Sequence, residues 1–236
     1  MWDVAQYEKF RDERSRPFFD LLARVPERAY ARIADLGCGS GELTRALAER
    51  WPAARVTGLD NSPEMLAKAR AIPGRLDFLL GDLAQAPEAD LLFSNAALQW
   101  VPGHDVLIPA LARRAPVLAV QIPTHYDSPA HRELEALAGP LPLRTEPLAD
   151  YLRWLRAAGM DVEAWETVYG HQLADVAAVV EWMKGTALRP LLARLDAAGQ
   201  AAFLEAYARR LEGAFPDVGG AILFPFRRLF FVAVRR

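Results

Sequence analysis

Cysteine is nearly missing from this sequence. The 236 residues include one, Cys38, so no disulfide can form within the chain, and we expect a reducing compartment, the cytoplasm. The four histidines have no zinc-ligand spacing, so we expect no metal site. The N-terminus lacks the layout of a signal peptide, and no apolar run is long enough to cross a bilayer as a helix.

An excess of charge of either sign is missing as well. The formal net charge of -2 at pH 7 gives no field that would recruit nucleic acid or an acidic membrane surface. We therefore expect neither as a partner, and any anion site has to be local. Because 52% of the residues are hydrophobic, the chain can bury one substantial core with a smaller appendage.

Short apolar runs that end in a polar residue or a glycine predict buried strands. Segments with helical spacing separate several of these runs. Strands and helices that alternate at this length predict parallel pairing with right-handed crossovers, and therefore a doubly wound α/β sheet. The predicted strands are 31–37, 54–60, 76–83, 89–96 and 116–123, and the helices between them are 42–51, 62–71 and 105–114.

The C-terminal third follows another pattern. Residues 151–159 have helical spacing, whereas 162–173 and 229–236 alternate or are apolar as strands are. Roughly 55 residues with helical patterns separate these two strands, which is unusually long for a hairpin connection. We therefore predict a helical layer inserted over one end of the sheet.

The first predicted strand leads into a glycine-rich turn. Asp35 precedes Gly37, Gly39 and Gly41, and a helix follows. Glycines permit a tight strand-to-helix turn and let a ligand approach the backbone. Nineteen residues after Gly41 the second strand ends in Asp60, a carboxylate that can accept hydrogen bonds from both ribose hydroxyls of an adenosine group.

Two further strand ends lie at the same predicted edge of the sheet. The third strand is followed by Gly81 and Asp82, and the fourth ends in Ser94 and Asn95. Open α/β sheets bind ligands at the carboxyl ends of their strands, so these residues are candidates for a binding site. A helix cap or a turn explains Asp82 equally well, and close packing explains Gly41.

The glycine spacing distinguishes between two cofactor classes. A dinucleotide site has the spacing G-x-G-x-x-G, whereas this turn has G-x-G-x-G after an acid. Glu42 lies in the first turn of the following helix, where a pyrophosphate would meet its negative charge. A sulfonium cofactor with an ammonium group tolerates these acids. The pattern therefore favours S-adenosylmethionine over a nicotinamide dinucleotide.

Together these strand ends resemble the motifs of the class I S-adenosylmethionine-dependent methyltransferases. Several longer segments resemble, more narrowly, the trans-aconitate methyltransferase family, and the likeness covers nearly the whole chain. It departs where the loop before 116–123 is clipped and where 124–145 is shorter and richer in proline, which would alter one wall of a substrate pocket. The segments that carry the likeness are 2–25, 94–104, 118–123, 179–192 and 224–233.

The resemblance implies a fold and a domain organisation. We expect a Rossmann-like, doubly wound seven-stranded sheet whose last two strands form an antiparallel hairpin. The chain would be a single methyltransferase domain and, we expect, a monomer. Its expected parts are an N-terminal helical lid (1–29), a cofactor-binding α/β core (30–173), a helical insertion that forms part of the substrate pocket (174–226) and a final strand (227–236).

The resemblance also implies an activity, the esterification of one carboxylate of a small polycarboxylic acid, most directly trans-aconitate. A carboxyl group with a pKa of about 4 is already ionised at neutral pH, so the reaction needs positioning and desolvation, and no catalytic acid or base. The residues expected to bind S-adenosylmethionine are Asp35, Gly37, Cys38, Gly39, Gly41, Asp60, Asn61, Met65, Asp82, Leu83, Asn95 and Trp100.

Arg189 is the first candidate for a substrate carboxylate. Pro190 predicts that a new helix begins here, and a cation at the positive end of a helix is unfavourable unless an anion joins it. From the residues alone, an arginine that extends into solvent is an equal alternative. Lys184 lies in the last turn of the preceding helix, where it suits the helix dipole without any ligand.

The other candidates for the substrate site each have an alternative. Tyr169 and His171 share one strand face, although packing explains them as well. Trp100 serves equally well as a core anchor. One of Arg227 and Arg228 is expected to face the pocket, and Arg227 is our candidate. The complete set of substrate candidates is Arg189, Tyr169, His171, Gln99, Tyr7, Arg14 and Arg227.

Two other functions fit the same residues. One is a methyltransferase that acts on a carboxyl group carried by an acyl carrier protein, which would need a basic exposed patch around the cleft. The other is a module that binds S-adenosylmethionine without turnover, which would retain the cofactor and methylate no acid.

Overall fold

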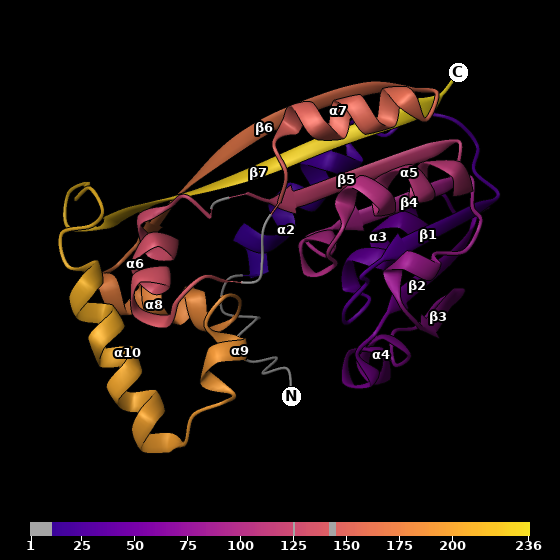
Figure 1. The fold of residues 1–236 in the computed structure, drawn as a ribbon. Coiled ribbons are helices and arrows are strands. Elements are labelled where there is room, and N and C mark those ends of the chain that lie inside the picture. The colour runs from indigo at the N-terminus through magenta and orange to yellow at the C-terminus, as the bar shows by residue number, and fades with distance from the viewer. Residues whose placement is uncertain (1–10, 125, 142–144) are drawn as a thin grey trace.

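The computed structural model describes residues 11–124, 126–141 and 145–236. Seven strands in these ranges form a single sheet in the order β3-β2-β1-β4-β5-β7-β6 (Figure 1). In chain order they are β1 (Arg32–Leu36), β2 (Arg55–Asp60), β3 (Leu76–Leu80), β4 (Leu91–Asn95), β5 (Val117–Pro123), β6 (Met160–Leu173) and β7 (Ile222–Arg235). β1 to β5 pair in parallel, and β7 runs antiparallel between β5 and β6. The predicted doubly wound sheet with a terminal antiparallel hairpin is confirmed.

The central strands are buried on both faces, as their apolar runs predict. Every residue of β5 is buried. Successive residues of a strand point to opposite faces, so in β4 Leu91 and Phe93 join one hydrophobic cluster and Leu92 joins the other. The sheet therefore divides the core into two layers.

Helices from different parts of the chain cover the two faces. Residues of α5 (His104–Arg114) and α7 (Leu148–Ala157) complete one hydrophobic cluster. Residues of α2 (Arg11–Leu22) and α3 (Glu42–Arg50) contribute to the other. Figure 1 shows α7 lying along the β6–β7 hairpin, while α4 (Pro63–Ala69) packs against β2 and β3.

The predicted helical insertion is present between β6 and β7. It contains α8 (Val176–Lys184), α9 (Arg189–Leu192) and α10 (Ala197–Leu211), and α6 (Pro129–Ala138) packs against α10. These helices gather at the end of the sheet where the β6–β7 hairpin projects beyond its neighbours (Figure 1). No helix within the described ranges is long and apolar enough to span a membrane.

The final strand begins earlier than predicted, at Ile222 instead of 227 or 229. Pro225 argued against a strand at this position, because proline has no N–H to donate to a neighbouring strand. In the structure β5 pairs with β7 only from Arg228 onward, so Pro225 lies where β6 is the only neighbour. On the side that β5 does not reach, the missing N–H of Pro225 therefore removes no hydrogen bond between strands.

α6 was not predicted either, although its boundaries carry ordinary helix markers. The Ser128 hydroxyl caps the N-terminus by accepting from the backbone N–H of His131, and Pro129 occupies the first turn. Gly139 lies at the C-cap with φ of 83°. The prolines of 124–145 were interpreted only as a departure from the family pattern, and no helix was predicted there.

Candidate functional site

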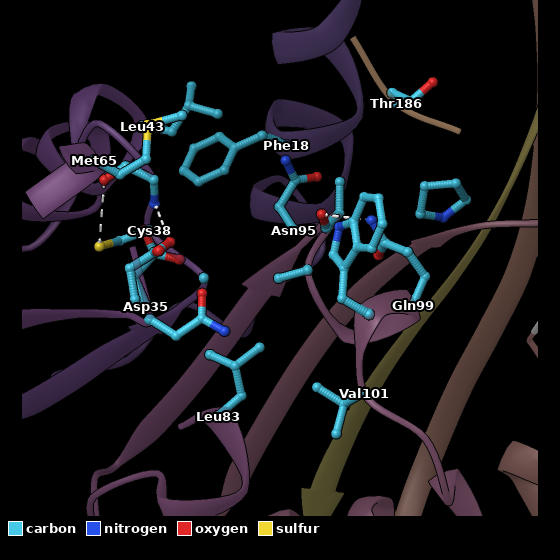
Figure 2. A pocket seen from close by; sticks show the side chains of 18 of the residues that line it. Phe18, Asp35, Cys38, Leu43, Met65, Leu83, Asn95, Gln99, Val101 and Thr186 are labelled. Atoms are coloured by element: carbon cyan, nitrogen blue, oxygen red, sulfur yellow. Dashed lines mark hydrogen bonds between the residues drawn. The ribbon is translucent and has the colours of Figure 1, made fainter. Parts of the chain in front are cut away.

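A cavity of about 550 Å³ lies at the carboxyl ends of the parallel strands. Figure 2 shows Asp35 and Cys38 on one side, Gln99 and Thr186 on the other, and Phe18 and Asn95 between them. We call the part lined by carboxylates the acidic side, and it contains Asp35, Glu42, Asp60 and Asp82. We call the polar lining residues that follow β5 in the chain the insertion side, and these are Tyr126, His131, Thr186, Arg189 and Arg228.

The glycine turn after β1 uses its three glycines differently. All three have positive φ, which L side chains rarely adopt. A Cβ on Gly37 would lie 2.1 Å from the Cβ of Ala97, and a Cβ on Gly41 would lie 2.8 Å from the Phe78 ring. A Cβ on Gly39 would meet nothing within 4 Å, and Gly39 lines the cavity. Gly41 is therefore explained by packing and does not reach the cavity wall, contrary to its predicted place in the site.

Asp60 ties the glycine turn to the end of β2. Its Oδ2 accepts from the backbone N–H of Gly39 at 2.8 Å, and its Oδ1 accepts from the N–H of Ser62 at 2.9 Å. Each carboxylate oxygen has a second lone pair, so both can still accept from a ligand. Asn61 and Met65, which follow Asp60 and are expected to bind the cofactor, also line the cavity.

Asp35 is the most deeply buried acid of the site. It is 3% exposed, and the Thr44 hydroxyl donates to its Oδ2 at 2.6 Å. Burial raises the pKa of Asp35 to about 7, because desolvation outweighs that one hydrogen bond. Burial also raises the pKa of the neighbouring Cys38 thiol, so Cys38 stays a neutral lining group.

The ends of β3 and β4 complete the acidic side. Asp82 caps a short 3₁₀ helix, η1 (Leu83–Gln85), by accepting from the N–H of Ala84 at 2.9 Å, and Asp82 and Leu83 both line the cavity. Asp82 is therefore both a cap and a lining residue, so the two predicted readings are compatible.

After β4 the chain forms η2 (Leu98–Trp100), which lines the cavity with Gln99 and Trp100. Gln99 Nε2 donates to the carbonyl oxygen of Ala96 at 2.7 Å. The acceptor oxygens Asn95 Oδ1 and Gln99 Oε1 are buried and have no hydrogen-bond partner among the described residues. These two oxygens are available to donors on a ligand. Trp100 remains 42% exposed, so it is a wall of the cavity and no core anchor.

The insertion side is built from segments far apart in the sequence. Arg189 begins α9 and lines the cavity, but α9 is a single turn, too short for the predicted helix-dipole effect. Burial lowers the pKa of Arg189, and the nearby charge of Glu64 opposes that shift. Burial also lowers the pKa of His131 to about 4, so this lining histidine is neutral at pH 7.

Several predicted substrate residues do not line the cavity in the described part of the chain. Tyr169 and His171 do share one strand face, with ring centroids 6.5 Å apart, but both are buried in packing. The Tyr169 hydroxyl donates to Asp20 at 2.5 Å, and the His171 ring lies 4.6 Å from that of Trp182. Their burial behind the wall makes them packing residues, the alternative given above.

Arg227 is also absent from the cavity wall formed by the described residues. It forms an ion pair with Asp127 at 3.3 Å on the surface, while its neighbour Arg228 lines the cavity. The strand alternation that decides between them was hidden because β7 was expected to begin at 227 or 229, within or after this pair. Tyr7 and the Arg14 side chain lie outside the described residues.

Some residues that line the cavity were not predicted as site residues. Phe18 belongs to a segment expected to be a lid, and Tyr126 and His131 belong to the stretch 124–145, in which no helix was predicted. The capping residues Ser128 and Pro129 were the signal that could have located His131 on a helix. No local pattern identifies Phe18 or Tyr126, because only the fold brings them to the strand ends.

Comparison with known proteins agrees with this architecture. A family model described as a methyltransferase domain matches residues 33–119. Among solved structures, the phosphoethanolamine N-methyltransferase 2 of Haemonchus contortus superposes with a TM-score of 0.58 at 18% identity, covering 93% of this chain and 52% of that one. The geranyl diphosphate C-methyltransferase of Streptomyces coelicolor superposes with a TM-score of 0.54 at 15% identity, covering 99% and 82%. These likenesses show a shared class I methyltransferase fold.

Two relatives are much closer in sequence. The trans-aconitate 2-methyltransferase of Methylobacterium nodulans is 48% identical over 254 residues, which cover 99% of this chain and 98% of the relative. The protein of the same name from Streptomyces avermitilis is 48% identical over 259 residues, which cover 98% and 96%. At this identity over nearly the whole length, the chain belongs to the trans-aconitate 2-methyltransferase family.

Proposed function

We propose that this protein is an S-adenosylmethionine-dependent O-methyltransferase that converts one carboxylate of trans-aconitate into its methyl ester. The observation that carries the proposal is one cavity lined both by carboxylates at the strand ends and by arginines of α9 and β7. The near-full-length similarity to proteins named trans-aconitate 2-methyltransferase supports the choice of acid.

The acidic side fits S-adenosylmethionine better than a pyrophosphate cofactor. Asp60, at the end of β2, can accept from ribose hydroxyls, and Gly39 leaves open space against the backbone. The buried oxygen of Asn95 and the carboxylate of Asp35 offer acceptors and negative charge. When bound, the cofactor supplies an electrophilic methyl group on a positively charged sulfur.

The insertion side suits an anionic acceptor. Arg189 and Arg228 provide positive charge, while His131 and Tyr126 line the same side as neutral groups. A carboxylate is a nucleophile without deprotonation at neutral pH, so these residues need only bind it, orient it and exclude water. Phe18, Trp182 and Phe226 bring apolar surface to the wall, which strengthens electrostatic attraction inside the cavity.

We also propose that the protein works in the cytoplasm and as a monomer. The support for a cytoplasmic site is the single cysteine, Cys38, which is a buried thiol and needs no oxidising compartment. Size-exclusion chromatography with light scattering tests the monomer, and a mass near 52 kDa, twice the 26.2 kDa of one chain, would contradict it.

The activity is tested with purified protein and methyl-labelled S-adenosylmethionine. We expect a base-labile methyl ester on trans-aconitate and much less on a panel of other tricarboxylates, dicarboxylates and monocarboxylates. No labelled ester from any acid would contradict the proposal. If S-adenosylhomocysteine still binds in calorimetry while no acid is methylated, the protein is a cofactor-binding module instead.

The cofactor assignment is tested with Asp60→Ala. Losing the ligand hydrogen bonds of a carboxylate should weaken S-adenosylhomocysteine binding by roughly 10- to 100-fold, whichever acid is used as acceptor. Calorimetry measures this affinity directly. An unchanged affinity would show that Asp60 only holds the glycine turn.

A further inference from the structure

His104 is a buried histidine that the proposed chemistry does not use. It begins α5, is 4% exposed, and is not among the described residues that line the cavity. Its Nε2 lies 2.8 Å from the carbonyl oxygen of Leu98, and its Nδ1 lies 2.5 Å from the Tyr151 hydroxyl. Burying polar groups is costly unless each has a partner, and an apolar side chain would not need one. A role at the neighbouring cavity would account for a polar residue in this place.

The partners of His104 set the direction of both hydrogen bonds. A carbonyl oxygen can only accept, so Nε2 carries a hydrogen and donates to Leu98. The Tyr151 oxygen accepts from the backbone N–H of Glu146 at 3.3 Å, and burial raises the pKa of Tyr151, so its hydroxyl keeps the proton at pH 7. In the neutral imidazole ring Nδ1 then accepts from that hydroxyl. Because the bond at one ring nitrogen sets the tautomer, Tyr151 fixes His104 as a donor toward Leu98.

Leu98 begins η2, the turn that brings Gln99 and Trp100 into the cavity wall (Figure 2 shows Gln99). The Leu98 carbonyl also accepts from the backbone N–H of Val101 at 2.9 Å, which closes the turn. The hydrogen-bond geometry of a 3₁₀ turn is poorer than that of an α-helix. Trp100 is 42% exposed, so core packing does not enclose its side chain. The position of this wall therefore depends on what holds the backbone of η2.

The residue before Ala97 and η2 is also held by neighbouring groups. Ala96 has φ of 54°, the only positive φ outside glycine among the described residues. This conformation is unfavourable for an L residue and persists where the surrounding structure imposes it. The Ala96 N–H donates to the carbonyl oxygen of Gln121 at 3.0 Å, and its carbonyl accepts from Nε2 of Gln99 at 2.7 Å. The segment is thus fixed by β5 at Ala96 and by His104 at Leu98.

We propose that His104, held by Tyr151, is a positioning residue that fixes η2 in the cavity wall and thereby orients the ligands for methyl transfer. It acts through the Leu98 carbonyl, and the side chains that it places are those of Gln99 and Trp100. A misplacement of about 1 Å in groups that orient reactants can lower a rate about 100-fold. This inference rests on the proposed function and adds the buried network that keeps one wall of the site in place.

The test compares His104→Leu with Leu111→Ala, assayed well below the melting temperature of both. Leu111 is a fully buried residue two turns further along α5, so its truncation removes core packing and leaves the bond to Leu98 intact. Both variants should melt below wild type. Only His104→Leu should lower kcat for trans-aconitate, by roughly 10- to 100-fold with KM within about threefold, because orientation is lost while the insertion side still binds the acid. Equal kcat losses in the two variants would reduce His104 to a structural residue.

Conservative variants examine the two hydrogen bonds separately. His104→Gln keeps an N–H donor for the Leu98 carbonyl, so its kcat should stay within about fivefold of wild type. Tyr151→Phe removes the hydroxyl that sets the tautomer, so its kcat should lie between those of wild type and His104→Leu. A kcat for His104→Gln as low as that of His104→Leu would contradict the role of this donor.

A multiple-mutant cycle shows whether His104 acts through η2. In a background that carries Gln99→Ala and Trp100→Ala, His104→Leu should lower kcat by less than about threefold, because the side chains that it places are gone. Independent effects would multiply instead. A further loss of about tenfold or more in this background would show that His104 acts on another part of the site.

Hydrogen exchange measures the stability of η2 without any turnover. The backbone N–H groups of Trp100 and Val101 donate within the turn, at 3.1 Å and 2.9 Å. Relative to the amides of β5, which report global unfolding, these two should exchange at least about tenfold faster in His104→Leu. In Leu111→Ala the same ratio should stay near that of wild type.

The outcomes separate this inference from the proposed function. If the wild type forms no ester, the proposed function fails, and the exchange of the η2 amides alone decides whether His104 fixes the turn. If the wild type is active, an unchanged kcat in His104→Leu overturns the inference. If His104→Leu does not fold, Tyr151→Phe decides, and a wild-type kcat with wild-type exchange in that variant overturns it.

Discussion

Asp35 holds its proton unusually tightly for an aspartate. Its pKa is raised from 3.8 to about 7, chiefly by burial. The folded protein therefore binds more protons at this site than the unfolded chain between these two values. The contribution of Asp35 to stability is fully present below about pH 4 and is lost as the pH rises through about 7. A nearby cation would reverse this preference by favouring the carboxylate.

That reversal predicts a pH dependence of cofactor binding. S-adenosylmethionine carries positive charge, so its affinity should rise up to tenfold per pH unit below about pH 7 and level off above it. S-adenosylhomocysteine lacks the sulfonium charge and should show a weaker dependence. Calorimetry between pH 5.5 and about 8.5 measures both profiles. Asp35→Asn serves as the control and should flatten the curve, whereas a flat curve in the wild type would contradict a role for this titration.

At this scale the sequence predicted chemistry better than position. Asp35, Asp60 and Asp82 were located because each follows a recognisable strand, and strand ends meet at one edge of a parallel sheet. Arg227 was preferred to Arg228, and the structure places Arg228 in the cavity wall instead. No local pattern shows which of two adjacent residues faces inward when the start of the strand is unknown. Tyr169 and His171 do share one face, yet α2 packs against Tyr169 and α8 packs against His171.

In the turn between β1 and α3, Gly37 is required for packing, whereas Gly39 leaves space for a ligand. Gly37→Ala would place a Cβ 2.1 Å from that of Ala97, so the backbone must shift. We expect this variant to lose about 2–4 kcal/mol of stability from overpacking and a positive φ, measured as a fall in melting temperature. A variant that melts like wild type would show that the turn can relax.

Gly39→Ala should act on binding instead. Its Cβ meets no described atom within 4 Å and enters the cavity, so only the cost of a positive φ, about 1–2 kcal/mol, should affect stability. S-adenosylhomocysteine affinity should fall by roughly tenfold or more, because a methyl group occupies space that the ligand needs. Calorimetry and thermal melting on both glycine variants check the contrast, and an equal loss of affinity in the two would contradict it.

Elements were predictable where local markers and tertiary pairing agree. β1, β2, β4 and β5 are short apolar runs with marked ends, and their buried positions match that pattern. β3 was also predicted to be buried, but it lies at the edge of the sheet and has no buried residue. The predicted β7 was too short because Pro225 was taken to lie outside the strand. A strand tolerates proline where it has no neighbour on one side, and the sequence does not show that β5 is absent there. The one-turn α9 lay too close to α8 for periodicity to indicate its length.

The hydrophobic core continues from the sheet into the insertion. One cluster joins Phe18 of α2, Phe93 of β4, Trp182 of α8 and Tyr207 of α10. A shared core of this kind makes separate unfolding of its parts costly. We therefore propose that the whole chain is one domain, as the resemblance to the family implied.

A single domain should unfold in one cooperative transition. Calorimetric and van't Hoff enthalpies should agree, and circular dichroism and tryptophan fluorescence should give the same midpoint. S-adenosylhomocysteine at a hundredfold excess over its Kd should add about 2.7 kcal/mol, which raises the melting temperature by roughly 5–10 °C. Two separate transitions, only one of which responds to the ligand, would contradict the single domain.

The β6–β7 hairpin also has a consequence for how substrate preference can change over generations. The carboxylates of the cavity come from the first half of the chain, whereas Thr186, Arg189 and Arg228 come from the hairpin and the segment that it carries. Replacement of the segment between Leu173 and Ile222 by recombination would exchange Thr186 and Arg189 and leave every cofactor-facing strand end intact. Acceptor choice and cofactor choice are thus inherited as separate blocks, so a lineage can acquire a new acid while keeping the same methyl donor.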